Sequence, residues 1–247
     1  MKSSRENKPW SSLATRFCVA VMTFAIGMGA HWVSSFRSPE STPPPPAPSF
    51  ESAEPGTLRA TILAAKAKGD KTVELSLIAC GSDTGRLQDA LSKDTVVLAE
   101  LVGQKTYADT YGVHTWYRFK VKETLVQHPP PPLDYSPFES APSDMLPIAE
   151  DELVIQEANG RMEIEGITVI QHSNGAAYLE GQTYLLFLWI DPLTRTATRI
   201  GTDPLGVFLV DNNGNLTSYI DQPYPLKTDL RRRFKDSVDN MREALKK

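Results

Sequence analysis

The sequence predicts a mainly β protein, a small antiparallel barrel or sandwich with flanking helices, preceded by one N-terminal transmembrane helix. Short runs of β-branched and aromatic residues recur along the chain, and those at 95–102 and 181–190 are the most apolar of them. Asn-Gly turn signals at 159–160 and 213–214 fall between such runs, as is typical of antiparallel sheets. A run of uncharged residues from Phe17 to Val33 predicts the transmembrane helix.

The run from Phe17 to Val33 has the length and composition of a single membrane-spanning helix. At about 1.5 Å per residue, roughly 17 residues reach about 25 Å, close to the thickness of a bilayer's hydrocarbon core. The residues before it are mostly basic, with Lys2, Arg5, Lys8 and Arg16 against Glu6. Because positive flanks stay in the cytoplasm, we expect a cytoplasmic N-terminus over 1–16 and a signal-anchor over 17–36. The expected location is the cell membrane, with a single pass and the C-terminal domain outside.

A cleaved secretory signal is the alternative to a retained anchor. Ala25 and Gly27 are small residues at the spacing that signal peptidase requires. The apolar core of a signal peptide is usually shorter than this run, which favours retention. Cleavage would instead give a secreted protein.

The proline-rich stretch 37–56 predicts a tether between the anchor and the folded domain. Its prolines are Pro39, Pro43, Pro44, Pro45, Pro46, Pro48 and Pro55. Proline fixes φ and lacks an N–H donor, so we expect an extended polyproline II spacer with no core contacts. About 18 residues at roughly 3.1 Å each would hold a domain about 50 Å from the membrane. Residues 57–247 are enough for one extracytoplasmic, β-rich domain.

The first part of this domain contains two strands that we expect to pair antiparallel. They cover 95–102 and 116–122, with a polar loop at 103–112 between them. Alternation along the second strand places Tyr117, Phe119 and Val121 in the core and Arg118, Lys120 and Lys122 outside. Before these strands, the patterns predict a helix over 57–68, a strand over 72–79 and a short helix capped by Ser82 and Asp83.

The second part of the domain is predicted to be mostly strand. A proline-rich insertion at 128–150 is expected to form an exposed loop. The segment 181–190 is expected to be a central strand buried on both faces. Leu230 to Leu245 has one apolar stripe and predicts a single amphipathic helix. The remaining predicted strands are 153–156, 162–164, 167–170, 199–200, 207–210 and 216–220.

A series of short motifs resembles an uncharacterised bacterial extracytoplasmic β domain. The motifs are Asp94-Thr-Val-Val, His114-Thr-Trp-Tyr-Arg-Phe-Lys-Val-Lys-Glu-Thr-Leu125, Val154-Ile-Gln, Asn159-Gly160, Gly181-Gln-Thr-Tyr-Leu-Leu-Phe-Leu188 and Gly206-Val-Phe. The resemblance covers about half of the chain. It departs from the pattern at Val126-Gln127, where such domains have Lys-Gly, and at Asn159, where they have Gly. The resemblance implies a membrane-anchored or extracytoplasmic β fold without catalytic residues. A looser likeness, to netrin-type modules, implies an OB-like barrel.

Composition and motif content argue against several function classes. The formal net charge is −4, whereas nucleic-acid binding needs clustered Lys and Arg. Cys18 and Cys80 fall on opposite sides of the tether, so we expect no disulfide. The four histidines form no metal-binding spacing, and no nucleophile or nucleotide motif occurs. We therefore expect no metal, no cofactor and no nucleic acid, and a non-enzymatic role is favoured.

Two loops, at 107–112 and 172–175, are the best candidates for a binding surface, because exposed tyrosines suit recognition. The candidate binding residues are Tyr107, Tyr111, His114, His172 and Asn174. Our first hypothesis is a membrane-tethered module that binds a protein or an envelope component. The alternatives are an extracytoplasmic enzyme with a non-standard site and a structural subunit of an envelope complex. A deep pocket that brings His114 or His172 beside an acid would favour the enzyme.

Overall fold

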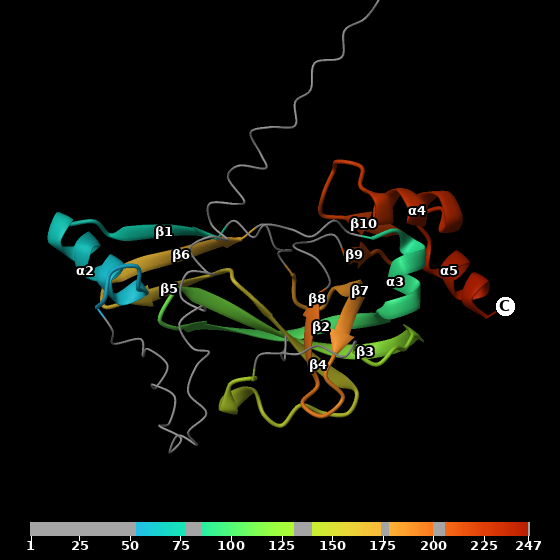
Figure 1. The fold of residues 1–247 in the computed structure, drawn as a ribbon, viewed down its shortest axis with the longest axis horizontal. Coiled ribbons are helices and arrows are strands. Elements are labelled where there is room, and N and C mark those ends of the chain that lie inside the picture. The colour runs from blue at the N-terminus through green and yellow to red at the C-terminus, as the bar shows by residue number, and fades with distance from the viewer. Residues whose placement is uncertain (1–52, 78–84, 131–139, 174–177, 200–205, 247) are drawn as a thin grey trace, which may run out of the picture. The chain divides into compact units, whose positions relative to one another are not determined.

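The computed structural model of the protein describes residues 53–77, 85–130, 140–173, 178–199 and 206–246 (Figure 1). All of them belong to the second of two units into which the chain divides, Ala47–Lys247. The predicted anchor from Phe17 to Val33 lies outside the described residues, as do most of the tether and Asn174. Within the described ranges, every helix is too short or too polar to cross a membrane.

The described strands form two sheets, and the fold is mainly β with flanking helices, as predicted. The smaller sheet has the strand order β1 (Thr72–Leu77), β6 (Ile167–Ser173), β5 (Gly160–Ile164). The larger sheet has the order β10 (Leu216–Ser218), β9 (Val207–Val210), β7 (Thr183–Ile190), β2 (Thr95–Ala108), β3 (Val113–Val126), β4 (Glu152–Glu157), β8 (Thr196–Arg199).

Five strands of the larger sheet close into a ring. β2 pairs antiparallel with both β3 and β7, and β3 pairs antiparallel with β4. β8 completes the ring because it pairs parallel with β4 and antiparallel with the end of β7. At this closure, Ala197 lies opposite Ile155 on one side and Ile190 on the other. β9 and β10 continue the sheet outward from the first half of β7.

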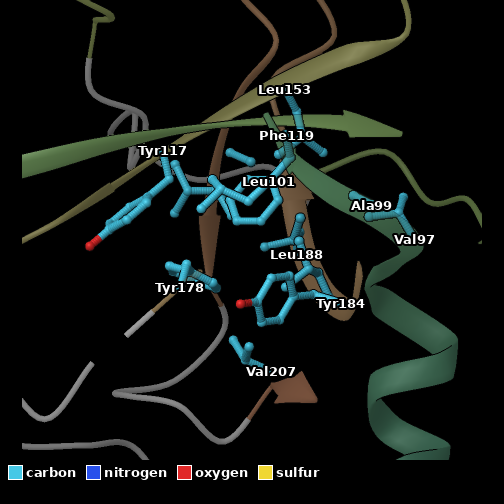
Figure 2. Packing of buried hydrophobic residues seen from close by; sticks show 13 residues of the cluster. Val97, Ala99, Leu101, Tyr117, Phe119, Leu153, Tyr178, Tyr184, Leu188 and Val207 are labelled. Atoms are coloured by element: carbon cyan, nitrogen blue, oxygen red, sulfur yellow. The ribbon is translucent and has the colours of Figure 1, made fainter. Parts of the chain in front are cut away.

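Large apolar and aromatic side chains fill the interior of the ring (Figure 2). Tyr117 and Phe119 are buried and Val121 packs against the same cluster, which confirms the predicted inward face of β3. Tyr178 lies between Tyr117 and Tyr184, with ring centroids 4.8 and 5.3 Å away and edge-to-face geometry (Figure 2). The interior is therefore a packed core.

Helices cover the outer face of the larger sheet at β2, β7 and β9 (Figure 1). They are α3 (Leu87–Lys93), α4 (Pro225–Phe234) and α5 (Val238–Leu245). Leu185 and Phe187 of β7 pack in this outer cluster, whereas Leu186 and Leu188 point into the ring. β7 is thus buried on both faces, as predicted for a central strand.

The smaller sheet packs beside the far end of the β2–β3 hairpin. α2 (Leu58–Lys68) covers one face of this sheet and contributes Leu58 and Ile62 to a cluster with Val113 and Val169. Thr57 caps the helix N-terminus, since its hydroxyl accepts a hydrogen bond from the Ala60 amide. Gly69 ends the helix in the left-handed conformation. This helix matches the prediction over 57–68.

The polar loop predicted at 103–112 is wrong for most of its length. β2 and β3 stay paired as far as Ala108 opposite Val113, so the turn is limited to 109–112. Polar residues such as Lys105 and Thr106 lie in the strand because each has a cross-strand partner on β3. The hairpin therefore extends well past the ring.

Three further local predictions need correction. The single helix expected from Leu230 to Leu245 is two helices, because Lys235 and Asp236 have left-handed φ values of 54° and 53°. The N-cap of α3 is Arg86, not Ser82 or Asp83, which lie outside the described residues. The turn at 159–160 joins strands of different sheets rather than closing a hairpin.

Candidate functional site

A pocket of about 290 Å³ opens at the end of the ring where β2 begins and β3 and β7 end. We call it the ring-end pocket. Its wall is apolar and consists of Val97, Val121, Pro129, Pro130, Ile190 and Pro192. Its polar lining consists of Thr95, Thr124, Gln127, His128 and Arg195. An apolar wall with a few convergent polar groups is typical of a ligand site.

Arg195 is the cationic group of this pocket. It ends the β7–β8 loop with a φ of 59°, and its amide donates to the Asp191 carbonyl at 2.9 Å. Its Nε donates to the Glu152 carbonyl at 3.1 Å, which ties the guanidinium to β4. Among the described residues, no carboxylate forms an ion pair with Arg195. The Glu152 carboxylate is held instead by Arg118, at 2.7 Å.

The loop that carries Arg195 is ordered by Asp191. One carboxylate oxygen of Asp191 accepts from the Leu193 amide at 2.9 Å, and the other accepts from the Thr194 hydroxyl at 2.8 Å. An aspartate that bonds to the backbone two residues on stabilises a tight turn. The turn thereby fixes where Arg195 enters the pocket.

His128 also lines the pocket and is hydrogen-bonded to two other segments of the chain. Its amide donates to the Thr95 hydroxyl at 3.1 Å, and that hydroxyl donates to the His128 carbonyl at 2.9 Å. The imidazole Nε2 lies 3.0 Å from the Leu91 carbonyl. Because a carbonyl oxygen only accepts, Nε2 carries a proton in this contact.

Asp94, next to Thr95 of the pocket lining, is a buried acid with an exposed fraction of only 3%. Burial raises the pKa of its carboxyl to about 6, and this outweighs the lowering effects of a hydrogen bond from Trp189 and of the positive potential of His128 and Lys93. Acids with perturbed pKa values cluster at functional sites, and structural ion-pair networks also perturb pKa values.

Three of the predicted binding residues come together at the far end of the β2–β3 hairpin. Tyr107 lies directly opposite His114, and Tyr111 occupies the turn with 68% of its surface exposed. Asp109 organises this turn, since its carboxylate accepts from the Tyr111 and Gly112 amides and lies 2.6 Å from Nε2 of His114. The hairpin end is therefore a rigid polar surface.

The remaining predicted binding residues do not join this group. His172 lies on β6 with its Nε2 3.8 Å from the Glu74 carboxylate. Its neighbour Gln171 is the residue that faces the hairpin turn, beside Gly112, so alternation places His172 on the other face of the sheet. Asn174 lies outside the described residues.

Residues 140–150 form a strap over the outer face of β3 and β4, and part of the insertion expected to be an exposed loop is thus packed. Met145 is buried against Trp116 and Val154. The Tyr107 hydroxyl donates to the Asp144 carboxylate at 2.5 Å. Burial, together with this hydrogen bond, raises the pKa of Tyr107 to about 12. Arg118 donates to the carbonyls of Met145 and Pro147 and so holds the strap from beneath.

Sequence reasoning missed Arg195, His128 and Asp94 as site residues. A local signal existed at the β7–β8 turn, where Asp191 and Thr194 have the spacing of a tight aspartate turn. No signal in the nearby sequence indicates that this turn lies close to Gln127 and His128. They come together only because the ring closes. Among the described residues, no group of three or more His, Cys, Asp or Glu side chains is placed to hold a metal ion.

Comparisons with known proteins add no identification, because the chain matches no family model, no curated protein and no solved structure.

Proposed function

We propose that the chain is a membrane-tethered extracytoplasmic binding module, and that its five-stranded ring is a small barrel of the OB type. Barrels of this type have five strands in a closed or nearly closed order, and their strand faces and loops bind ligands. The pairings of β8 with β4 and β7 support this architecture. The run from Phe17 to Val33 and the proline-rich tether support attachment to the membrane.

The ring-end pocket is the proposed site for a protein or envelope component. In OB-type barrels, ligands often lie on the face formed by the second and third strands. Here those strands are β3 and β4, and their outer face carries the strap through Met145 and Arg118. The observation that carries the proposal is the ring-end pocket itself, where Arg195 and His128 meet beside an apolar wall.

Site-specific photo-crosslinking in intact cells tests this proposal. A photoreactive residue with a small aliphatic diazirine side chain replaces Thr124, an exposed residue of the pocket lining. The matched control replaces Lys120, which is also exposed on β3 but lies about 13 Å farther along the strand. We expect a discrete adduct from position 124 that is absent from position 120, and mass spectrometry identifies its envelope component. Equal labelling at both positions, or none at 124, contradicts the proposal.

An extracytoplasmic hydrolase is the second candidate, favoured by one observation. His114 lies 2.6 Å from the Asp109 carboxylate, the geometry in which an acid orients an imidazole base. However, neither His114 nor His172 lines the ring-end pocket. Assays of ester, amide and glycoside hydrolysis with wild type and His114→Gln decide the matter. Turnover that His114→Gln abolishes would support the enzyme; we expect none.

A further inference from the structure

We propose that the ring-end pocket binds the C-terminal carboxylate of a polypeptide whose last residue is aliphatic, with Arg195 as the partner of the carboxylate. This inference rests on the proposed function and names the class of its ligand. It is carried by the charge of the pocket, by its size and by the chemistry of its wall.

The charge of the pocket favours an anion. Arg195 uses Nε for the Glu152 carbonyl, and the two terminal nitrogens of the guanidinium are the donors that suit a carboxylate. Two acids accept hydrogen bonds from Arg195 through their backbone carbonyls, and their carboxylates are engaged elsewhere. Asp191 is bonded to Leu193 and Thr194 within its own turn, and the Glu152 carboxylate is bonded to Arg118.

The size and the wall of the pocket favour an aliphatic residue beside that anion. A volume of about 290 Å³ is at the lower end of the range for ligand pockets, which suits one residue rather than a large ligand. Val97, Val121 and Ile190 contribute aliphatic surface to the pocket. A chain ending in valine or leucine carries a branched side chain and a carboxylate on the same carbon. An internal Asp or Glu has no such branched group beside its carboxylate.

Gln127 and Thr124 complete the match with a peptide backbone. Both side chains line the pocket and are exposed. An amide or hydroxyl oxygen accepts a hydrogen bond from a backbone N–H, and the Gln127 amide also donates. Capture of a chain end by a cation and a few polar groups is a recurring mode of peptide recognition.

Fluorescence anisotropy with the full-length chain in mild detergent tests the inference. The probe is fluorescein-labelled Gly-Ala-Ala-Val with a free C-terminal carboxylate, and the matched probe is the same peptide with a C-terminal amide. We expect the acid to bind at least about tenfold more tightly than the amide, because a charged hydrogen bond is lost. Arg195→Gln should reduce binding of the acid by a similar factor and leave binding of the amide unchanged. The control, Arg161→Gln, replaces an exposed arginine of β5 and should change neither.

A second variant guards against misfolding of the β7–β8 loop. Thr124→Phe introduces an aromatic side chain into the pocket from β3 and leaves Arg195 and its loop unsubstituted. It should block both probes, while the circular dichroism spectrum stays unchanged. Unlabelled 3-methylbutanoate, added as a competitor, separates a free small carboxylate from a chain terminus.

Equal affinity for acid and amide, or for the acid in wild type and Arg195→Gln, overturns the inference. So does competition by 3-methylbutanoate at the concentrations at which the unlabelled peptide acid competes, because the ligand would then be a small molecule. If any of these results occurs while the crosslink at position 124 persists, the ring-end pocket keeps its proposed function and only the ligand class is wrong. If the crosslink is also absent, the proposed function fails as well.

Discussion

The indole Nε1 of Trp189 donates a hydrogen bond to the carboxyl group of the buried Asp94, at 3.3 Å. Trp189 lies at the end of β7 and Asp94 directly before β2, so this bond joins the two strands beside the ring-end pocket. One hydrogen bond does not compensate for burial of the charged carboxylate, since the pKa of Asp94 is raised to about 6.

The first prediction follows from this raised pKa. An unfolded Asp has a pKa of about 3.9, so between pH 4 and pH 6 the folded state binds more protons than the unfolded state. The free energy of unfolding should therefore fall as pH rises through this window, by about 3 kcal/mol in all, and then level off. Asp94→Asn keeps an acceptor for Trp189 and should remove this pH dependence.

Urea unfolding at pH 4.5, 5.5 and 6.5 measures the effect. Asp94→Asn should be the more stable protein at pH 6.5, by about 3 kcal/mol. Glu163→Gln, at an exposed position of β5, serves as the control. A stability difference between wild type and Asp94→Asn that is the same at every pH would show that the Asp94 carboxyl does not titrate in this range.

The second prediction concerns Gly160, where β5 crosses the β2–β3 hairpin. Its φ is +147°, and a Cβ atom here would lie 2.7 Å from the Thr115 hydroxyl and 2.8 Å from a methyl carbon of Thr106. Gly160→Ala should lower the free energy of unfolding by about 2–4 kcal/mol. Gly103→Ala is the matched control, because nothing lies within 4 Å of its Cβ position. Equal melting temperatures for the two variants would contradict this account.

The third prediction concerns the break between α4 and α5. Lys235 ends α4 with a left-handed φ of 54°, a conformation that favours glycine. Lys235→Gly should therefore raise the free energy of unfolding by about 0.5–1 kcal/mol. Arg233→Gly, inside α4 and also exposed, should lower it. Thermal unfolding distinguishes them, and a loss of stability in both variants would mean that Lys235 is not strained.

The fourth prediction concerns the strap. Arg118 lies beneath it, 3.3 Å from the Pro147 carbonyl and 2.7 Å from the Glu152 carboxylate. That carboxylate also accepts from the Ala149 amide at 3.2 Å. Arg118→Leu should speed hydrogen exchange of the Ala149 amide about tenfold, because a charged anchor is lost. Lys120→Leu, two residues along β3, removes an exposed ion pair and should have little effect. Unchanged exchange in Arg118→Leu would mean that Met145 alone holds the strap.

The fifth prediction tests the proposed anchor. The double variant Val21→Arg, Ile26→Arg places two charges in the hydrocarbon, at about 2.5–3.5 kcal/mol each near the helix centre. The apolar residues gain only a few tenths of a kcal/mol each on the same scale, so insertion should be lost. Membrane fractionation measures the result, and Val21→Leu, Ile26→Leu is the control. Recovery of wild type in the soluble fraction, with an N-terminus at Met28 or later, would instead show a cleaved signal.

Elements with strong local patterns were predictable, and those set by distant pairing were not. The alternation at Tyr117 and Phe119 identified an inward face correctly, and the apolar run at 181–190 identified the central strand. The polar half of the β2–β3 hairpin was not predicted as strand, because its residues are held in the strand by their cross-strand partners. The break after α4 was not predicted, because its left-handed position is occupied by Lys235 and not by the glycine that usually marks such a break.

The candidate site was predictable only where its residues are neighbours in the sequence. Tyr107 and His114 flank one turn, so they lie close together in the structure as they do in the sequence. Arg195 and His128 come from segments that meet only when β8 pairs with β4 and β7. A single sequence carries no signal for such a pairing, and for that reason the ring-end pocket had to be found in the structure.

The closure of the ring by β8 also determines the order in which the strands can pair while the chain is being synthesised. β2 and β3 are adjacent hairpin strands and need only a short turn to pair. β7 must then return to β2, and β8 to β4, after long intervening segments, which makes both steps slow. Until residue 199 has left the ribosome, one edge of β2 and one edge of β4 lack their partners β7 and β8. The unfinished chain thus exposes unpaired strand edges during that interval, and such edges promote aggregation.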